Sequence, residues 1–133
     1  MTKSNIFCLI DVDTQYDFTF PDGNLYVPEA ESLIPNIASL IEASKNYNIP
    51  VVSSIDSHIK DDPEFATWNP HCIEGTKGHS KINETIIEPK IIIPIENISF
   101  DLSKYKSVWI KKRIYSMFEN NNTKDILNYI DEN

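Results

Sequence analysis

Cysteine, positive charge and long apolar runs are all scarce in this sequence, and each scarcity excludes a class of protein. The chain of 133 residues has two cysteines, Cys8 and Cys72, which are too few for a disulfide framework and typical of a reduced intracellular protein. The first apolar stretch, Ile6 to Ile10, has only five residues. It is too short for the core of a signal peptide or for a membrane span. We therefore expect a cytoplasmic protein.

Acidic residues outnumber basic ones. Twelve Lys and Arg against twenty Asp and Glu give a formal net charge of −8, which repels the phosphates of nucleic acids and the headgroups of anionic lipids. The basic run Lys111-Lys112-Arg113 is too small to form a nucleic-acid-binding surface. We expect neither nucleic acid nor a membrane surface as a partner.

The hydrophobic pattern of residues 1–133 predicts one domain, because there is no repeat, low-complexity tract or Gly/Ser linker. The apolar run at 6–10 indicates a strand that is buried on both faces. Residues 29–47 predict an amphipathic helix and residues 51–55 a second strand. A strand, a helix and a strand in this order form a βαβ unit, in which the strands are parallel. We expect an α/β fold with a parallel β-sheet flanked by helices.

The second half of the chain has fewer regular elements. Residues 57–90 are rich in loop signals, residues 106–112 predict a third strand, and residues 121–123 cap a last helix over 124–130. An α/β chain that ends on a helix, with no strand after it, is typical of a truncated domain. We therefore expect that the C-terminal part of the fold is missing.

Polar, reactive side chains follow all three predicted strands. Parallel strands have their carboxyl ends along one edge of the sheet, and this edge is where such sheets bind ligands. Random placement of surface charges would not favour this arrangement. The sequence therefore predicts a functional site that is formed by Asp11, Asp13, Asp56, His58, Lys111 and Lys112.

Asp56-Ser57-His58 is the strongest local signal for a metal site. Residues two apart in an extended chain share a face, with alpha carbons ~6.5 Å apart, so the carboxylate and the imidazole can converge on one ion. His71 follows thirteen positions after His58, and Glu64 between them offers another oxygen. Mixed oxygen and imidazole ligands favour Zn, Fe or Mn over Ca. The alternative is that the histidines are ordinary loop residues.

Asp13 and Lys112 each have two interpretations. Asp13 is either a turn residue that accepts hydrogen bonds from nearby backbone amides or a partly desolvated general base. Lys112 is either a solvated lysine or the cation that keeps Asp13 ionised. The segment 11–14 also resembles the Asp-x-Asp strand end of haloacid-dehalogenase phosphatases, but Gln15 stands where that pattern has Thr or Val.

Several separated motifs together resemble the isochorismatase-like cysteine hydrolases, and in particular their nicotinamidase (pyrazinamidase) branch. The motifs occur in the same order as in that family and are residues 9–18, 23–28, 56–58, 68–76 and 112–118. The resemblance implies a Rossmann-like three-layer α/β/α fold. It also implies hydrolysis of nicotinamide, or of a related small amide, to the acid and ammonia.

The resemblance assigns roles to individual residues. Asp13 resembles the aspartate that takes the proton of a cysteine thiol, and Lys112 the lysine that helps to hold the thiolate. Phe18 and Trp68 resemble the aromatic walls of the pyridine pocket. The implied ligands of a divalent metal, usually zinc or iron, are Asp56, His58, Glu64 and His71.

The family's nucleophilic cysteine lies in a later turn together with the amides that hold the oxyanion, and nothing after Asn120 matches that turn. We expect the cysteine of the Cys-Asp-Lys triad to lie beyond this chain. Four alternatives stay open: a non-catalytic metal- or pyridine-binding remnant, a subunit completed by a second chain, a homo-oligomer, or a hydrolase that uses metal-bound water.

Overall fold

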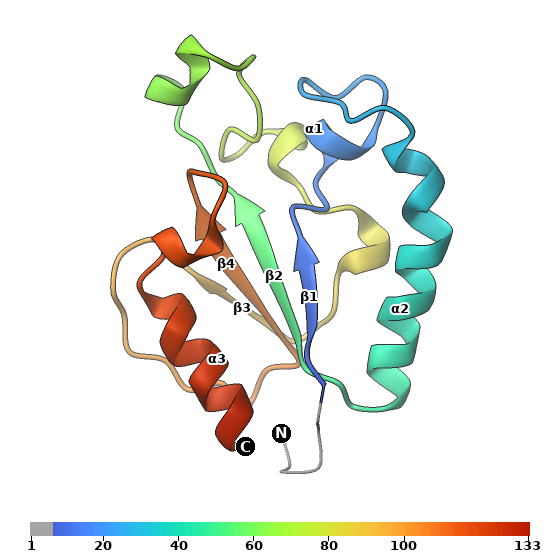
Figure 1. Cartoon of the computed structure of the whole chain (residues 1–133), viewed down its shortest axis with the longest axis vertical. Helices are drawn as coiled ribbons and strands as arrows, with labels where there is room; N and C mark the ends of the chain where they lie inside the picture. Colours follow the sequence, from blue (N-terminus) through green and yellow to red (C-terminus); the bar gives the residue numbers. More distant parts are fainter. Residues whose placement is uncertain (1–6) are drawn as a thin grey trace.

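Four parallel strands form the centre of the structure, a computed structural model that describes residues 7–133 (Figure 1). The strands are β1 (Leu9–Val12), β2 (Val51–Asp56), β3 (Lys90–Ile93) and β4 (Ser107–Lys112), in the order β1-β2-β4-β3. Each pairing is parallel, so the carboxyl ends of all four strands lie along one edge of the sheet. The predicted α/β fold with a parallel sheet is confirmed.

Two of the three α-helices lie where the sequence predicts a helix, and α1 lies in a segment predicted as a loop. They are α1 (Tyr16–Thr19), α2 (Ile34–Asn46) and α3 (Asn122–Glu132), with short 3-10 helices η1 (Ala30–Leu33), η2 (Pro63–Ala66), η3 (Lys77–His79), η4 (Asn83–Thr85) and η5 (Met117–Glu119). The predicted helix over 29–47 corresponds to η1 and α2, and the predicted last helix to α3. Pro35 lies in the first turn of α2, where a helix makes no use of the missing N–H.

Apolar side chains pack on both faces of the sheet. Val51 and Val52 are neighbours in β2 and therefore point to opposite faces. Val51 packs with Ile41 of α2, and Val52 packs with Ile126 of α3. The sheet thus lies between two helical layers, as expected for a three-layer α/β/α fold. No helix within residues 7–133 is long and apolar enough to cross a membrane.

Two predictions about strands are wrong. The strand predicted at residues 6–10 is formed by Leu9–Val12, and Ile6 lies outside the described residues. Ile10 is exposed rather than buried, and so is Val12 on the same face, because the apolar cluster around α3 that covers this face at β2 and β4 does not extend to them. The sequence pattern also predicts no strand at β3, since its three isoleucines form too short an apolar run to signal one.

The segment after η3 is tied to β1 beside Asp13. Lys81 forms an antiparallel bridge with Gln15, and its ammonium group pairs with the carboxylate of Asp11. Both side chains are buried, and Ser53 Oγ donates a hydrogen bond to the same carboxylate oxygen at 3.0 Å. Burial lowers the pKa of Lys81, although the Asp11 carboxylate acts in the opposite direction. A buried pair of this kind is costly to break from one side.

Replacing Lys81→Met should destabilise the fold, because it leaves the buried Asp11 carboxylate without its cation. We expect the free energy of unfolding, measured by urea titration, to fall by about 3 kcal/mol. The double variant Asp11→Asn/Lys81→Met should recover at least half of that loss. Lys60→Met makes the same change at an exposed position and should have little effect. An equally mild effect of Lys81→Met would contradict the importance of the pair.

Candidate active site

The side chains predicted at the strand ends meet at the carboxyl edge of the sheet. Asp13 follows β1, and Asp56 of β2 lies in register with Lys112 of β4. Lys112 Nζ lies 2.8 Å from Asp13 Oδ2 and 3.4 Å from Asp56 Oδ1. Lys111 points away from this cluster and pairs with Glu74 at 2.8 Å. One buried ammonium group thus joins carboxylates from two different strands.

The charge of Lys112 is retained because of its two partners. Burial acts to lower the pKa of Lys112, but the neighbouring Asp13 and Asp56 carboxylates outweigh burial, and the pKa is raised. The lysine side chain is 3% exposed, whereas that of Asp13 is 21% exposed. The cation is therefore a fixed element of the site, and Asp13 is the member of the pair that is accessible to solvent.

Asp13 is held in a left-handed backbone conformation, with φ +50°, which is uncommon for residues other than glycine and concentrates at functional sites. Its backbone N–H donates to the carbonyl of Ser54 at 3.2 Å. Ser54 Oγ donates in turn to Asp13 Oδ1 at 2.7 Å. Backbone and side chain are thus both fixed against β2, and the carboxylate cannot turn away from Lys112 without breaking these contacts.

Gln15 fixes the end of β2, although the sequence reasoning assigned it no function. Its buried side-chain amide accepts from the backbone N–H of Asp56 and donates to the Asp56 carbonyl, both at 2.8 Å. A parallel bridge between His58 and Ile73 then places residues 71–74 beside the strand end. These contacts bring His71 next to His58, from which it is far apart in the sequence.

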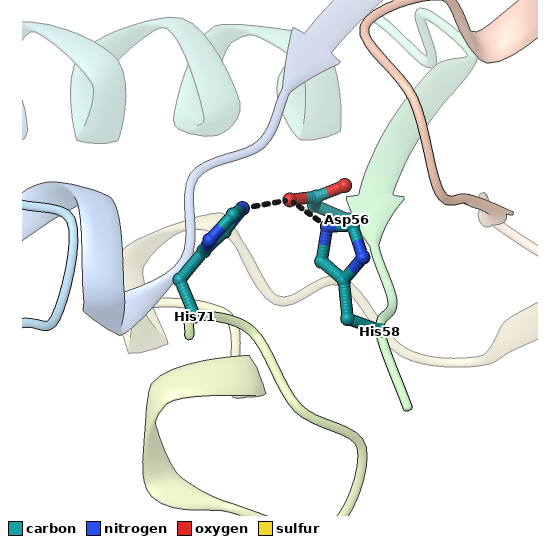
Figure 2. A group of neighbouring side chains, drawn as sticks. All are labelled: Asp56, His58 and His71. Atoms are coloured by element: carbon teal, nitrogen blue, oxygen red, sulfur yellow. Dashed lines mark hydrogen bonds and ion pairs between the residues drawn. The ribbon is translucent and has the colours of Figure 1, made fainter. Parts of the chain in front are cut away.

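Two imidazoles and a carboxylate converge at this point (Figure 2). Asp56 Oδ2 lies 3.0 Å from His58 Nε2 and 3.1 Å from His71 Nε2. Glu64 Oε2 lies 3.4 Å from His58 Nε2. Ligand atoms around a tetrahedral zinc ion are about 3.3 Å apart, because each lies ~2.0–2.1 Å from the metal. The structure thus brings Asp56, His58 and His71 together, with Glu64 beside His58, and it groups His58 and Glu64 also with Asp62. The role of the four predicted residues as ligands stays a prediction.

Hydrogen bonds determine which nitrogen of each imidazole faces this cluster. His71 Nδ1 lies 2.7 Å from the carbonyl oxygen of Asn69, and His58 Nδ1 lies 2.9 Å from Asp62 Oδ2. Both partners are acceptors, so each Nδ1 carries a proton. In a neutral imidazole the Nε2 atom then presents a lone pair, which here faces the lone pairs of the Asp56 carboxylate.

A cation between these atoms would remove the repulsion between their lone pairs. Glu64 Oε2 is buried without a hydrogen-bond partner among the described residues, as expected for an atom that has a metal for a partner. Without a metal, a proton on His71 serves the same purpose. Burial acts to lower the pKa of His71, but the hydrogen bond to Asp56 outweighs it, and the pKa is raised. The residues present fit a divalent metal.

The pKa of Asp56 reflects the same environment. Burial acts to raise it, but the hydrogen bond to His71 and the charge of Lys112 outweigh burial, so the pKa is lowered. Asp56 therefore stays ionised, with one oxygen toward the histidines and the other toward Lys112. The carboxylate links the metal-binding cluster to the Asp13–Lys112 pair.

A cavity of about 370 Å³ opens beside this cluster. Asp13, Asp56 and Lys112 lie on one wall together with Glu64 and His71. Phe18 and Trp68 line the cavity, as the resemblance implied, although their contact with a substrate stays a prediction. The remaining lining residues belong to the motifs at 23–28 and 112–118, to which the resemblance assigned no role in the pocket, and they are Leu25, Tyr26, Val27, Pro28, Ile114 and Tyr115.

Neither thiol of the chain is suited to act on this cavity. Cys72 is fully buried, and burial, together with repulsion by Asp56 and Asp17, raises the pKa of its thiol. Cys8 precedes β1 and is therefore at the opposite end of that strand from Asp13. Burial also raises the pKa of Cys8. Within residues 7–133, neither cysteine lines the cavity beside Asp13 and Lys112.

The chain belongs to the isochorismatase family, because the isochorismatase domain model matches residues 7–92, which is more than half of its length. This membership favours the hydrolase prediction over the haloacid-dehalogenase alternative. No curated protein matches the chain significantly.

Solved structures with the same fold include three amidases. N-carbamoylsarcosine amidase from Thermoplasma acidophilum is 28% identical, with a TM-score of 0.70. Pyrazinamidase of Pyrococcus horikoshii in complex with zinc is 28% identical (TM-score 0.70), and nicotinamidase from Bacillus subtilis is 25% identical (TM-score 0.72). Each comparison covers 92% of this chain but only 60%, 63% and 64%, respectively, of the other protein.

Thiol labelling tests the assignment of the cysteines. In a Cys8→Ser variant, which isolates Cys72, we expect labelling by iodoacetamide at neutral pH to be at least 100-fold slower in the folded chain than in urea, because a buried thiol with a raised pKa is unreactive. Mass spectrometry after timed quenching measures the rate. Labelling of the folded chain at the rate of the unfolded chain would show that Cys72 is accessible and would make it a candidate nucleophile.

Proposed function

We propose that this chain provides the metal centre, the Asp13–Lys112 pair and the ring pocket of a nicotinamidase-like amidohydrolase. Such an enzyme converts nicotinamide, or a related small amide, into the acid and ammonia. The observation that carries the proposal is the position of Lys112, whose ammonium group joins Asp13 to the carboxylate of Asp56 at the wall of the cavity. Similarity to the nicotinamidase of Bacillus subtilis and the pyrazinamidase of Pyrococcus horikoshii supports it.

The metal centre in this proposal is formed by Asp56, His58, Glu64 and His71. Zinc is the favoured ion, since two imidazoles and two carboxylates suit it and the similar pyrazinamidase is in complex with zinc. Iron and manganese fit the same donors. When bound, the metal would supply a Lewis-acid position for a ring nitrogen of the substrate.

Asp13 is the proton acceptor in the proposed reaction. It takes the proton of a thiol, the thiolate attacks the amide carbon, and the proton leaves with ammonia. Water then releases the acid from the thioester. Lys112 stays charged throughout, because two carboxylates raise its pKa, and its charge stabilises the neighbouring thiolate. Since neither Cys8 nor Cys72 meets Asp13, the thiol is supplied from outside these residues, for example by a complementing chain.

The cavity favours a neutral, flat substrate. Its walls are mainly apolar and aromatic, with Phe18 and Trp68 among them. Lys112 is the only lysine or arginine that lines it within the described part of the chain, and this lysine already has two carboxylate partners. Apart from the proposed metal, a substrate that carries its own carboxylate, as N-carbamoylsarcosine does, would find no unpaired cation here. This favours a pyridine or pyrazine amide over an acidic amide.

The burial of Cys72 also favours a second candidate function, in which the chain binds a metal and a pyridine without turnover. The metal centre and the aromatic cavity would be the same in both cases. The two functions differ in whether a thiol reaches Asp13.

Ammonia release separates these two functions. The purified chain with zinc should release no ammonia from nicotinamide. Fusion to the part of Bacillus subtilis nicotinamidase that this chain does not match should restore turnover, and Asp13→Asn in the fusion should lower it by about 10²–10⁴-fold. Asp61→Asn, the same change at an exposed position, should not. Turnover by the chain alone, insensitive to thiol reagents, would instead support catalysis by metal-bound water.

Ligand binding by the chain alone tests the pocket. In a Trp109→Phe variant, Trp68 is the remaining tryptophan of the sequence, and nicotinamide should quench its fluorescence. Nicotinate has the same ring but carries a carboxylate, and we expect it to bind at least 10-fold more weakly because, apart from the metal, it finds no unpaired cation for that carboxylate. Chelation of the metal should weaken the binding of nicotinamide. Equal or tighter binding of nicotinate would contradict the proposed substrate class.

A further inference from the structure

Asp62 contacts two of the four proposed metal ligands although it is not one of them. It is the N-cap of η2, where its Oδ1 accepts a hydrogen bond from the backbone N–H of Glu64 at 2.9 Å. Its Oδ2 lies 2.9 Å from His58 Nδ1. The side chain is only 8% exposed, so water competes little for either contact. One carboxylate therefore connects the His58 ring to the turn that carries Glu64.

The contact with His58 determines what this histidine can do. A carboxylate that accepts a hydrogen bond from Nδ1 keeps the proton there, so the Nε2 lone pair faces Asp56 and Glu64. It also holds the ring orientation and makes Nε2 more basic. His58 Nδ1 and Nε2 are separated by one ring carbon and point in different directions. Asp62 therefore contacts the ring away from the nitrogen that faces Asp56.

The contact with Glu64 places the fourth ligand. Glu64 is the second residue of η2, and its backbone N–H has no partner inside so short a helix. The Asp62 carboxylate satisfies this N–H and thereby fixes the first turn. The Glu64 side chain then extends toward His58 Nε2, where its Oε2 lies at 3.4 Å.

We propose that Asp62 is a positioning residue of the metal centre, which sets the tautomer of His58 and the location of Glu64 through one carboxylate. The proposal rests on the metal centre described above and not on the identity of the amide. It predicts that the loss of Asp62 weakens metal binding even though all four ligands remain.

The hydrogen bond between His58 and Asp62 can be observed directly in the zinc-loaded chain. The sequence has three histidines, so ¹⁵N NMR of the imidazoles gives a spectrum that single substitutions can assign. With zinc on Nε2, the Nδ1 proton of His58 should exchange slowly with solvent in the unmodified chain and faster in Asp62→Ala, because the Asp62 carboxylate accepts this proton. His71 is an internal control, because its Nδ1 contacts a backbone carbonyl that the substitution leaves in place.

Zinc affinity is the second measurement, by competition with a chromophoric chelator. We expect Asp62→Ala to bind zinc about 10–100-fold more weakly, the usual effect of losing a carboxylate behind a ligating histidine. Asp61→Ala is the matched control, since it removes the neighbouring carboxylate, which is exposed. Its affinity should stay within about twofold of the unmodified chain, so a general loss of negative charge would not explain the effect.

Three outcomes would contradict the inference in distinguishable ways. If the unmodified chain binds no zinc, the metal centre itself is wrong. If Asp62→Ala is folded by circular dichroism and binds zinc as tightly as Asp61→Ala, only the role of Asp62 is wrong. If Asp62→Ala does not fold, Asp62→Asn replaces it, because the amide keeps the shape but has one acceptor oxygen for two donors. Unchanged zinc affinity in that folded variant would also overturn the role.

Discussion

The buried ammonium group of Lys112 is the interaction on which the site depends. Asp13 and Asp56 come from different strands, and each carboxylate lies within 3.4 Å of the Lys112 ammonium group. Without that cation, two carboxylates so close together would repel each other in a weakly polar interior. Lys112 lies between them because β4 is paired in register with β2. Its charge attracts both carboxylates and contributes to the lowered pKa of Asp56. Removing the cation would leave the buried Asp56 carboxylate and the partly exposed Asp13 carboxylate without their partner, which is more costly than losing a surface ion pair.

Asp56 extends this arrangement to the histidines. Its Oδ1 faces Lys112 and its Oδ2 faces the Nε2 atoms of His58 and His71. A metal among the histidines and the ammonium group of Lys112 would therefore share one carboxylate. Gln15 holds the backbone of Asp56 from both its N–H and its carbonyl, so the shared carboxylate has little freedom to favour one neighbour over the other. The two halves of the site are thus one connected unit.

The sequence predicts the parts of this site that follow from local pattern. The strand ends come from apolar runs, and the Asp56–His58 pair from the spacing of two residues on an extended chain. The pairing of Asp11 with Lys81 could not be predicted, because the two residues are seventy positions apart and no local pattern specifies such a partner. The same limit applies to Asp62. An Asp before Pro63 signals the start of a helix, but its contact with His58 depends on how the loop folds back.

The local sequence pattern also could not predict which single side chains are buried. Cys72 follows His71 in the sequence, yet its thiol is fully buried and lies near the carbonyl of Gly78. Adjacent side chains point apart, which excludes a Cys–His pair but does not tell which of the two faces the core. Val12 is exposed because the apolar cluster around α3 does not extend over this face of β1, which could be predicted only with knowledge of the strand order and of the position of α3.

The state of Asp13 connects these constraints to chemistry. Each of its oxygens already accepts one hydrogen bond, Oδ1 from Ser54 and Oδ2 from Lys112, and each carboxylate oxygen has a second lone pair. The carboxylate is therefore fixed in position and can still accept a proton from the cavity side, where it is partly exposed. A general base needs this combination, since its geometry must be set before the reaction while its basic atom stays accessible. In the proposed reaction, the residues between β1 and β4 would hold Asp13 in place for a thiol that approaches through the cavity.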